Sequence, residues 1–287
     1  MEKNIGIIGG DLRTCMLAKV LAEDGYKVHT YAIEQMKVET KLKEKIMFYE
    51  EIESLANNID IIISSIPLSK DENVIYTPFS KKTVYIDELF EKIEGKKFIA
   101  GAMAEYVYDI AHKNNIEIID ILKEEEMAVL NAIPTAEGAI QIAMEESEIT
   151  IHDSNCLILG FGRIGKILAK MLNGIGARVY CEARKEEDLA WIDAYGYNKV
   201  ILGDLDKNLK DYDYIFNTIP YMILDEKRLG KIKKECLIIE LASKPYGVDF
   251  EKAKEKEIKV ILAPGLPGKV APLTSARYIQ KVIYKLM

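Results

Sequence analysis

The sequence predicts an α/β fold with two parallel-sheet domains joined by a crossover helix. The first observation is an apolar strand at 156–159 that runs directly into Gly160-Phe-Gly162-Arg-Ile-Gly165. Apolar residues then recur at helix spacing, and a second apolar strand follows at 177–184. The second observation is that both halves of the chain alternate short apolar runs with helical patterns in a similar order. The third is the length of 287 residues, which is enough for two domains. Together they indicate two Rossmann-like domains with parallel sheets.

The first half begins with a strand at 4–8 that ends in Gly9-Gly10. A stretch with apolar residues on one helix face follows, and a strand at 27–31 comes next. This is a strand–turn–helix–strand unit, but its glycine pattern departs from G-x-G-x-x-G.

Arg13 falls in the first turn of this helix, where a cation opposes the helix dipole by ~0.3–1 kcal/mol. An anionic ligand would reverse that cost, so Arg13 is a candidate to bind a substrate carboxylate. Asp11 is a candidate cap for the same helix.

Three further apolar segments of the first half have counterparts in the second half. The pairs are 59–67 with 212–220, 97–101 with 237–242, and 116–120 with 258–263. Each segment is interpreted as a strand, so that each half builds its own parallel sheet. Repetition of a fold does not imply repetition of a site.

The seam between the halves lies in 120–155. The charged run at 123–126 is typical of a solvated face or a loop. Pro134 suits the first turn of a helix, because its missing N–H would have no partner there. We therefore predict that a crossover helix begins near Pro134.

These boundaries give an N-terminal α/β domain at 1–128, which would hold a substrate or a partner. The NAD(P)-binding domain would then occupy 129–287. A final helix at 273–287 follows Pro272 and is a candidate to pack back on the first domain.

Glu137 has two interpretations. Acids are favourable in the first turn of a helix, which would make Glu137 structural. The same position would face an interdomain cleft if the crossover assignment holds, and Glu137 would then be the best-placed general base. Asn131 and Thr135 belong to the same segment and are further candidates for the catalytic site.

The glycine motif of the second half predicts a dinucleotide site, and each glycine has a physical role. Gly160 permits a tight turn, Gly162 lets backbone N–H groups approach a pyrophosphate, and Gly165 lets the helix pack against the strand. The helix N-terminus, at Arg163 and Ile164, supplies partial positive charge toward the phosphates. The alternative is a Rossmann fold that has lost its ligand.

Two signals about the cofactor conflict at the end of 177–184. Glu182 lies near the position where an acid accepts hydrogen bonds from the ribose 2′-OH, which favours NAD. Arg184 follows, and an arginine there favours the 2′-phosphate of NADP. Because Arg184 can stack on adenine and pair bidentately with phosphate, the sequence slightly favours NADP over NAD. One or both side chains could instead be exposed charges without a ligand.

Strand ends of the second half are rich in Asn, Ser, Pro and Gly, and ligands bind along this edge of open α/β sheets. Asn217, Thr218 and Pro220 end one strand and are expected near the nicotinamide ribose. A polar strand end before a turn is the alternative. Ser243 follows the next strand, and 263–268 ends another, so these segments are expected to line the same cleft.

Bulk composition argues against several classes of function. The net charge of −7 disfavours nonspecific nucleic-acid binding. The four cysteines are far apart without a C-x-x-C motif, so we expect reduced thiols and no metal site. No apolar run approaches the ~18 residues needed to span a bilayer. Because no secretory signal precedes the first strand, we expect a cytoplasmic protein that does not act at a membrane.

Several motifs in this chain are more specific than a general dehydrogenase pattern. They are Ile5–Arg13, Asn131–Gly138, Gly160–Gly165, Asn217–Pro220 and Ala263–Gly268. The set closely resembles the A-subunit family of dipicolinate synthase, from spore-forming bacteria, and the resemblance covers nearly the whole chain. The segments N-x-I-P-T-x-E-G and A-P-G-L-P-G are its most distinctive parts.

The resemblance implies a reaction, a cofactor and a partner. The substrate would be 4-hydroxy-tetrahydrodipicolinate, a small dicarboxylate, which would lose water and two electrons to give dipicolinate during sporulation. Oxidised NADP or NAD would accept the hydride. The partner would be the flavoprotein-like B-subunit of dipicolinate synthase, in the mother cell of a sporulating bacterium. Which of the two polypeptides carries each chemical step stays open, as does a homo-oligomer.

Two other functions stay open. A 2-hydroxyacid or shikimate-type dehydrogenase shares the architecture, but the D-specific hydroxyacid class needs an Arg–Glu–His set and no histidine follows His152. A noncatalytic dinucleotide-binding protein that regulates a partner enzyme is the other.

Overall fold

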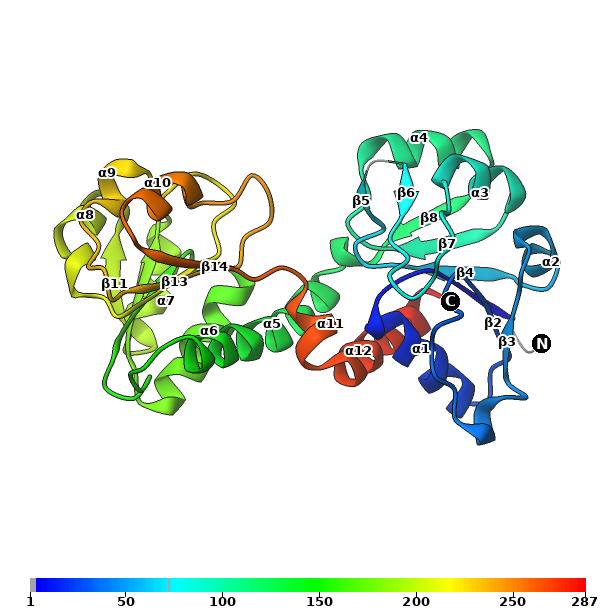
Figure 1. Ribbon diagram of the computed structural model, residues 1–287, viewed down its shortest axis with the longest axis horizontal. Helices are drawn as coiled ribbons and strands as arrows, with labels where there is room; N and C mark the ends of the chain where they lie inside the picture. Colours follow the sequence, from blue (N-terminus) through cyan, green and yellow to red (C-terminus); the bar gives the residue numbers. More distant parts are fainter. Residues whose placement is uncertain (1–3, 72) are drawn as a thin grey trace. The chain divides into compact units, whose positions relative to one another are not determined.

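Figure 1 shows the computed structural model, which describes residues 4–71 and 73–287. The chain divides into two compact units. The first contains Met1–Leu130 with Ala271–Met287, and the second contains Asn131–Val270. The division between them lies at 130/131, close to the 128/129 boundary suggested by the sequence, and the last helix belongs to the first unit.

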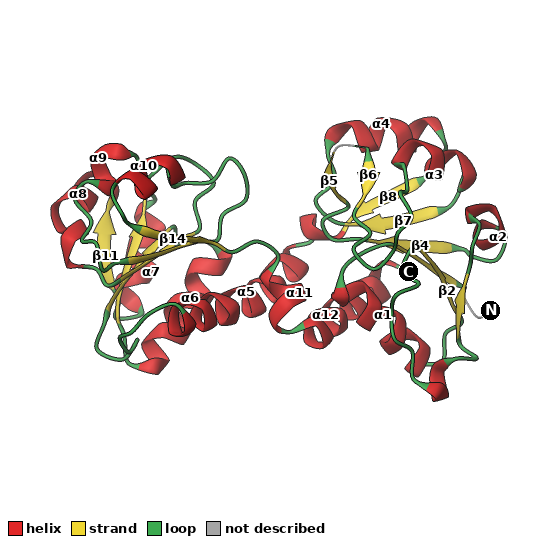
Figure 2. Ribbon diagram, in the orientation of Figure 1, coloured by secondary structure: helices red, strands yellow, loops and turns green. Residues whose placement is uncertain are grey.

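The first unit contains a parallel sheet of six strands in the order β3-β2-β1-β4-β7-β8. These strands are β1 (Ile5–Ile8), β2 (Val28–Tyr31), β3 (Ile46–Phe48), β4 (Ile61–Ser64), β7 (Lys97–Ala100) and β8 (Glu117–Asp120). A short antiparallel hairpin, β5 (Ser69–Asp71) and β6 (Val74–Ile75), stands apart from this sheet (Figure 2).

Helices cover both faces of the first sheet. They are α1 (Leu12–Glu23), α2 (Ile52–Ala56), α3 (Ile86–Lys92), α4 (Glu105–Lys113) and α12 (Pro272–Leu286). Neighbouring residues of β1 enter opposite cores, because Ile7 packs with residues of α1 and α12 whereas Ile8 packs with residues of α2 and α3. This alternation identifies a sheet that is buried on both faces.

The C-terminal helix α12 packs against α1 within the first unit. Ile279 and Ile283 of α12 share a core with Leu17 and Leu21 of α1. The Tyr284 hydroxyl also hydrogen-bonds to Asp24 Oδ2 at 2.8 Å. The last helix of the chain therefore completes the core of the first domain.

The second unit repeats this architecture with a parallel sheet in the order β11-β10-β9-β12-β13-β14. Its strands are β9 (Asn155–Leu159), β10 (Arg178–Ala183), β11 (Asn198–Ile201), β12 (Tyr214–Asn217), β13 (Leu237–Glu240) and β14 (Lys259–Leu262). Its helices are α6 (Arg163–Ile175), α7 (Glu186–Ala194), α8 (Leu205–Asn208), α9 (Glu226–Leu229), α10 (Phe250–Glu255) and α11 (Leu266–Val270). Helix α5 (Glu125–Glu145) connects the two units along the chain.

Both sheets have the strand order 3-2-1-4-5-6 when each is numbered from its own first strand. The order reverses beside that first strand, β1 or β9, and ligands of Rossmann folds bind outside the carboxyl ends of the strands at this point. The prediction of an α/β protein with two Rossmann-like domains and parallel sheets is confirmed.

Helix α5 begins well before the start that the sequence suggested near Pro134. Glu125 and Glu126 form its first turn, where acids complement the helix dipole. Of the two interpretations of 123–126, the loop is therefore wrong for these two residues, and the solvated face fits the exposed Glu125. Pro134 lies inside the helix, although a proline there removes a backbone hydrogen bond. Burial of apolar side chains along α5 offsets this loss, at Ala132, Ala136, Ala139, Ile140 and Ala143.

The described helices include none with the length and apolar character needed to cross a bilayer. The four cysteines are buried and free, and burial raises the pKa of the Cys15 and Cys156 thiols to about 12. Within residues 4–71 and 73–287, no group of three His, Cys, Asp or Glu side chains could hold a metal ion.

Candidate functional site

The glycine motif forms a tight turn between β9 and α6. Gly160 has φ +92°, a left-handed conformation that favours glycine. A Cβ at Gly160 would lie 2.6 Å from Oγ1 of Thr218, which follows β12. Thr218 Oγ1 donates a hydrogen bond to the Leu159 carbonyl at 2.8 Å. The carboxyl ends of β9 and β12 are therefore held together at the switch point.

Gly165 lets α6 approach this turn closely. A Cβ on Gly165 would overlap the carbonyl oxygen of Gly160. Because this oxygen belongs to the backbone, a larger residue at 165 would force the helix or the turn to shift.

Gly162 is exposed and is the N-cap residue of α6. A Cβ at Gly162 would have no atom of the described residues within 4 Å. Arg163, Ile164 and Gly165 are the first residues of α6, and N–H groups of a first turn have no acceptor inside the helix. Open space beside N–H donors at the positive end of a helix dipole suits a phosphate group.

The corresponding turn of the first unit is covered by its own chain. The Gly10 N–H donates to the Tyr76 carbonyl at 2.8 Å. A Cβ at Gly9 would lie 2.9 Å from Cγ2 of Thr77. The segment after β6 therefore lies on the turn that would have to receive a pyrophosphate. The two turns differ in access even though the two sheets share a strand order.

A buried amide–carboxylate pair joins the ends of β12 and β13. Asn217 is fully buried, and its Nδ2 donates to the two carboxylate oxygens of Glu240 at 2.8 and 2.9 Å. The same Nδ2 donates to the Ile219 carbonyl at 3.0 Å, and Asn217 Oδ1 accepts from the Ile219 N–H at 3.1 Å. The Asn217 amide is therefore used within the chain, where it shapes the turn before Pro220.

Three other residues expected at this edge lie at or near its surface. Thr218 is half-buried against the glycine turn, whereas Pro220 and Ser243 are exposed on the turns that follow β12 and β13. The structure thus brings these strand-end residues to the carboxyl edge of one sheet.

Glu182 lies inside β10, one residue before the strand ends. It is 1% exposed, and its carboxylate accepts a hydrogen bond from the Gly160 N–H. Burial raises the pKa of the Glu182 carboxyl. Its Oε1 has no hydrogen-bond partner among the described residues. Glu182 is enclosed beside the glycine turn. A ligand at the surface of this edge would therefore contact other residues.

Ala183 ends β10, and the exposed Arg184 and Lys185 follow it. The end of this strand is where an acid would contact the ribose hydroxyls of NAD, and Ala183 supplies none. The interpretation of Glu182 as the ribose contact is therefore not supported by its place in the strand, because Ala183 and not Glu182 ends β10. Within the part of the chain that the structure describes, Arg184 makes no hydrogen bond or ion pair.

Arg13 is paired with Asp11 in the first unit. Arg13 Nη2 lies 2.8 Å from Asp11 Oδ2, and Arg13 Nε lies 3.0 Å from Asp11 Oδ1. Nη2 also donates to the Ile66 carbonyl, and Arg13 is only 4% exposed. The premise that Arg13 needs an external anion is therefore wrong, because the carboxylate that caps α1 already neutralises it.

The catalytic candidates on α5 lie within the helix. Glu137 is exposed and far from the first turn, so the helix-dipole interpretation of Glu137 is wrong. Thr135 Oγ1 donates to the Asn131 carbonyl at 2.8 Å, and Asn131 Oδ1 is buried without a hydrogen-bond partner in residues 4–71 and 73–287. A Cβ at Gly138 would lie 3.1 Å from Leu266, so this glycine lets α11 pack against α5.

Comparison with known families gives two matches along the chain. Residues 4–122 match the N-terminal domain of the dipicolinate synthase A-subunit, and residues 133–244 match the NAD binding domain of D-isomer specific 2-hydroxyacid dehydrogenases. The dipicolinate synthase A-subunit of Bacillus subtilis (strain 168) is 33% identical over 291 residues, which cover 99% of this chain and 95% of that protein. The chain belongs to the dipicolinate synthase A-subunit family.

Two crystal structures from this family share the fold. The dipicolinate synthase A-subunit from Bacillus halodurans superposes with a TM-score of 0.90 at 30% identity, covering 100% of this chain and 98% of that one. Its counterpart from Bacillus subtilis superposes with a TM-score of 0.87 at 31% identity, covering 100% and 96%. The dehydrogenase match spans the open glycine turn, so the second unit is the nicotinamide-dinucleotide-binding domain of this family member.

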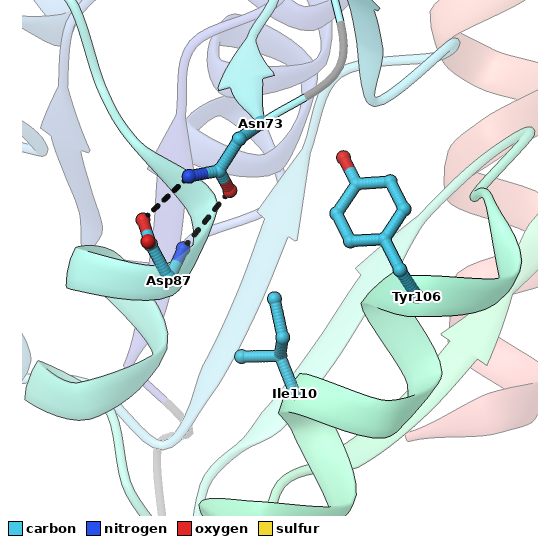
Figure 3. Close-up of a pocket in the computed structure, with 4 residues that line it drawn as sticks. All are labelled: Asn73, Asp87, Tyr106 and Ile110. Carbon is cyan, nitrogen blue, oxygen red and sulfur yellow. Dashed lines mark hydrogen bonds between the residues drawn. The ribbon is translucent and has the colours of Figure 1, made fainter.

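A cavity in the first unit lies between α3, α4 and the β5–β6 hairpin (Figure 3). It has a volume of about 440 Å³ and is lined by Asn73, Asp87, Tyr106 and Ile110. Asn73 Nδ2 donates to Asp87 Oδ1 at 2.8 Å, and this hydrogen bond lowers the pKa of the Asp87 carboxyl. Because an ionised Asp87 repels the carboxylates of a ligand, this cavity does not suit a dicarboxylate.

Proposed function

We propose that this chain is the NAD(P)-dependent component of a dipicolinate synthase, which forms dipicolinate from 4-hydroxy-tetrahydrodipicolinate during sporulation. Membership of the A-subunit family supports the substrate. The NAD-binding domain supports an oxidation step. The observation that carries the proposal is the open turn at Gly162, beside the first residues of α6, in contrast with the covered turn of the first unit.

The reaction removes one water and two electrons from the hydroxy-imine ring. Loss of the ring hydroxyl, with a proton from the neighbouring carbon, forms a second ring double bond. Departure of a hydride and a proton then completes the aromatic ring and makes the overall step favourable. Oxidised NADP supplies the hydride acceptor, and the chain supplies orientation and electrostatics.

We propose NADP as the cofactor, with NAD as the alternative. Ala183 offers no acid to the ribose hydroxyls, and Glu182 is enclosed. Arg184 is exposed without a hydrogen-bond or ion-pair partner among the described residues, so its guanidinium is available to a 2′-phosphate. The phosphates of the cofactor would lie over Gly160, Gly162 and the first turn of α6.

For the proton transfers we propose Glu137 as the base. It is an exposed carboxylate on α5 within the segment that is distinctive of the family. Asn131 Oδ1 is an unused acceptor on the same helix, and Thr135 holds the adjoining carbonyl. Arg13, paired with Asp11, is assigned to holding the loop at Ile66 and not to binding a carboxylate by itself.

Membership of an A-subunit family implies a second polypeptide, and we propose the flavoprotein-like B-subunit of dipicolinate synthase as the partner. The proposed location is the cytoplasm of the mother cell, with a small dicarboxylate as ligand and neither nucleic acid nor membrane as a partner. A homo-oligomer of this chain is compatible with the assignment.

The test is an assay with the purified chain, oxidised NADP and 4-hydroxy-tetrahydrodipicolinate. We expect dipicolinate and reduced cofactor to accumulate together in equal amounts. Turnover that appears only when the B-subunit is added would instead indicate a noncatalytic dinucleotide-binding role for this chain.

A 2-hydroxyacid dehydrogenase is the second candidate, because residues 133–244 match the NAD binding domain of that class. The lack of any histidine after His152 opposes it, since a hydroxyacid dehydrogenase of the D-specific class needs one as its acid–base group. Reduction of the cofactor by a panel of 2-hydroxyacids, with no turnover of the hydroxy-imine, would favour this candidate.

A further inference from the structure

One buried carboxylate holds two loops at the carboxyl edge of the second sheet. Glu240, the last residue of β13, is 0% exposed. Its oxygens accept the two hydrogen bonds from Asn217 Nδ2, one from the Ala242 N–H at 2.9 Å and one from the Gly247 N–H at 3.0 Å. These donors come from the end of β12, the start of the loop after β13 and the end of that loop.

The same two loops also touch through their backbones. A Cβ at Gly247 would overlap Asn217 Nδ2 and would lie 2.7 Å from the Ile219 carbonyl oxygen. The Gly247 carbonyl accepts hydrogen bonds from the Ile223 and Leu224 N–H groups, at 2.9 Å each. Hydrogen bonds therefore join the loops at 217–224 and 241–248 into one structural unit.

These joined loops follow β12 and β13, on one side of the switch point. The glycine turn follows β9, on the other side. In a Rossmann domain the two halves of a dinucleotide bind on opposite sides of the first strand. The β10 side carries Arg184 and takes the adenosine half, so the β12–β13 side takes the nicotinamide half. Glu240 is fully buried, and the residues of its loops that are not buried include Thr218, Pro220 and Ser243.

Each side of the edge contains one buried glutamate. Glu182 accepts the Gly160 N–H on the adenosine side, and Glu240 accepts N–H groups of both loops on the nicotinamide side. Burial raises the pKa of both carboxyls, and hydrogen-bond donors partly offset the cost of burying the charge, several at Glu240 and one at Glu182. The pair allows a matched comparison of the two half-sites.

We propose that Glu240 is a positioning residue for the nicotinamide half of the cofactor, and that it acts through the loops at 217–224 and 241–248. This inference rests on the proposed dinucleotide function of the second unit. It makes one demand that a general structural role does not make. Loss of the Glu240 hydrogen bonds must weaken the binding of the nicotinamide half of the cofactor and leave the binding of the adenosine half unchanged.

The test compares two ligands by calorimetry on the full chain. One is NADP, and the other is adenosine 2′,5′-bisphosphate, which carries only the adenosine half with its 2′-phosphate. In Glu240→Gln, an NH₂ group replaces an oxygen that now accepts backbone and Asn217 hydrogen bonds. We expect the affinity for NADP to fall roughly tenfold or more, toward that of the fragment. The affinity for the fragment should stay within about twofold of wild type.

Two further variants keep the test decisive. Glu182→Gln is the matched control, and any effect it has should fall on NADP and the fragment by the same factor, because both contain the adenosine half. Gly247→Ala disturbs the same contact from the other loop, and it should reproduce the selective loss of Glu240→Gln. If Glu240→Gln does not fold, it binds neither ligand, and Gly247→Ala then decides.

The proposal is overturned if the folded variants leave the affinity for NADP unchanged, or if they lower the affinity for both ligands equally. A wild-type chain that binds neither ligand would refute the proposed dinucleotide function together with this inference. Wild-type binding of both ligands without the selective loss would refute the inference alone.

Discussion

Gly165 packs so closely against Gly160 that a Cβ at position 165 would overlap the Gly160 carbonyl oxygen. This contact fixes the start of α6 against the turn that leaves β9. It also fixes the direction of the N–H groups in the first turn of α6. The geometry of the turn is therefore a property of packing within the chain, and the turn is open at Gly162.

Gly165→Ala should destabilise the second unit, because the added methyl group would overlap the Gly160 carbonyl oxygen, a backbone atom that cannot move without shifting the turn. We expect the free energy of unfolding to fall by about 1–3 kcal/mol, measured by urea denaturation. Gly174→Ala is the control in the same helix, since a Cβ there would meet no described atom within 4 Å. That variant should gain roughly 0.5–1 kcal/mol. Equal stability of Gly165→Ala and wild type would refute the close contact.

Glu182→Gln should change how stability depends on pH. Burial raises the pKa of Glu182 above its ordinary value of 4.5, so the folded chain retains a proton that the unfolded chain has lost. The wild type therefore loses stability as pH rises through 4.5 toward the raised pKa, and the variant lacks this loss. Urea denaturation at a series of pH values should show that the free energy of unfolding of the variant rises relative to that of the wild type as pH rises.

Glu257→Gln serves as the control of opposite sign. The ion pair with Lys234 lowers the pKa of the Glu257 carboxyl, so this group contributes stability above its ordinary pKa and loses it as pH falls. Parallel pH profiles for wild type and Glu182→Gln would contradict the enclosed, poorly solvated position of Glu182.

Arg184→Ala should weaken NADP and leave NAD nearly unaffected. The expected loss for NADP is ~1.5–3 kcal/mol, the scale of a hydrogen bond to a charged group. Lys185→Ala is the neighbouring control, because Lys185 Nζ lies 3.3 Å from a carboxylate oxygen of Glu187 and should matter less. Calorimetric titrations with both cofactors check this. An equal loss for NADP and NAD would exclude a contact with the 2′-phosphate.

Glu137→Gln should lower kcat by ~10²–10⁴ with a modest change in KM, because it keeps the shape of the side chain and removes the base. The control is Glu145→Gln at the end of the same helix, where the carboxylate accepts a hydrogen bond from Gln141 at 2.8 Å. The steady-state assay with the hydroxy-imine and NADP measures both variants. Retained turnover in Glu137→Gln would remove this residue from the mechanism.

Much of the fold could be predicted from the sequence, because its signals are local. The glycine turn at 160–165 and the apolar runs that become β4, β7, β12 and β13 are contiguous patterns. The edge strands β3 and β11 escaped prediction, because short and partly exposed strands lack a continuous apolar run. The early start of α5 also escaped, because the burial that offsets its internal Pro134 depends on packing across the fold.

The site was predictable only where its determinants are close in sequence. Gly160 and Gly165 make the tight turn and the close helix contact that their spacing suggests, and the space beside Gly162 is open. The Tyr76 carbonyl that accepts the Gly10 N–H is far from Gly10 in the sequence. The Glu240 carboxylate that accepts from Asn217 Nδ2 is likewise far from Asn217. Such contacts decide whether a turn is open or an amide is available, and no local pattern reports them.

The proposed dinucleotide site is tested most directly by a calorimetric titration of Gly162→Val with NADP, beside the wild type. A Cβ at this position meets no atom of the described residues within 4 Å, so the fold should survive while the added branched side chain fills the space for the pyrophosphate. We predict saturable binding of NADP to the wild type and its collapse in a folded variant. Equal affinity of the two proteins for NADP would contradict the assignment of the dinucleotide site to this turn.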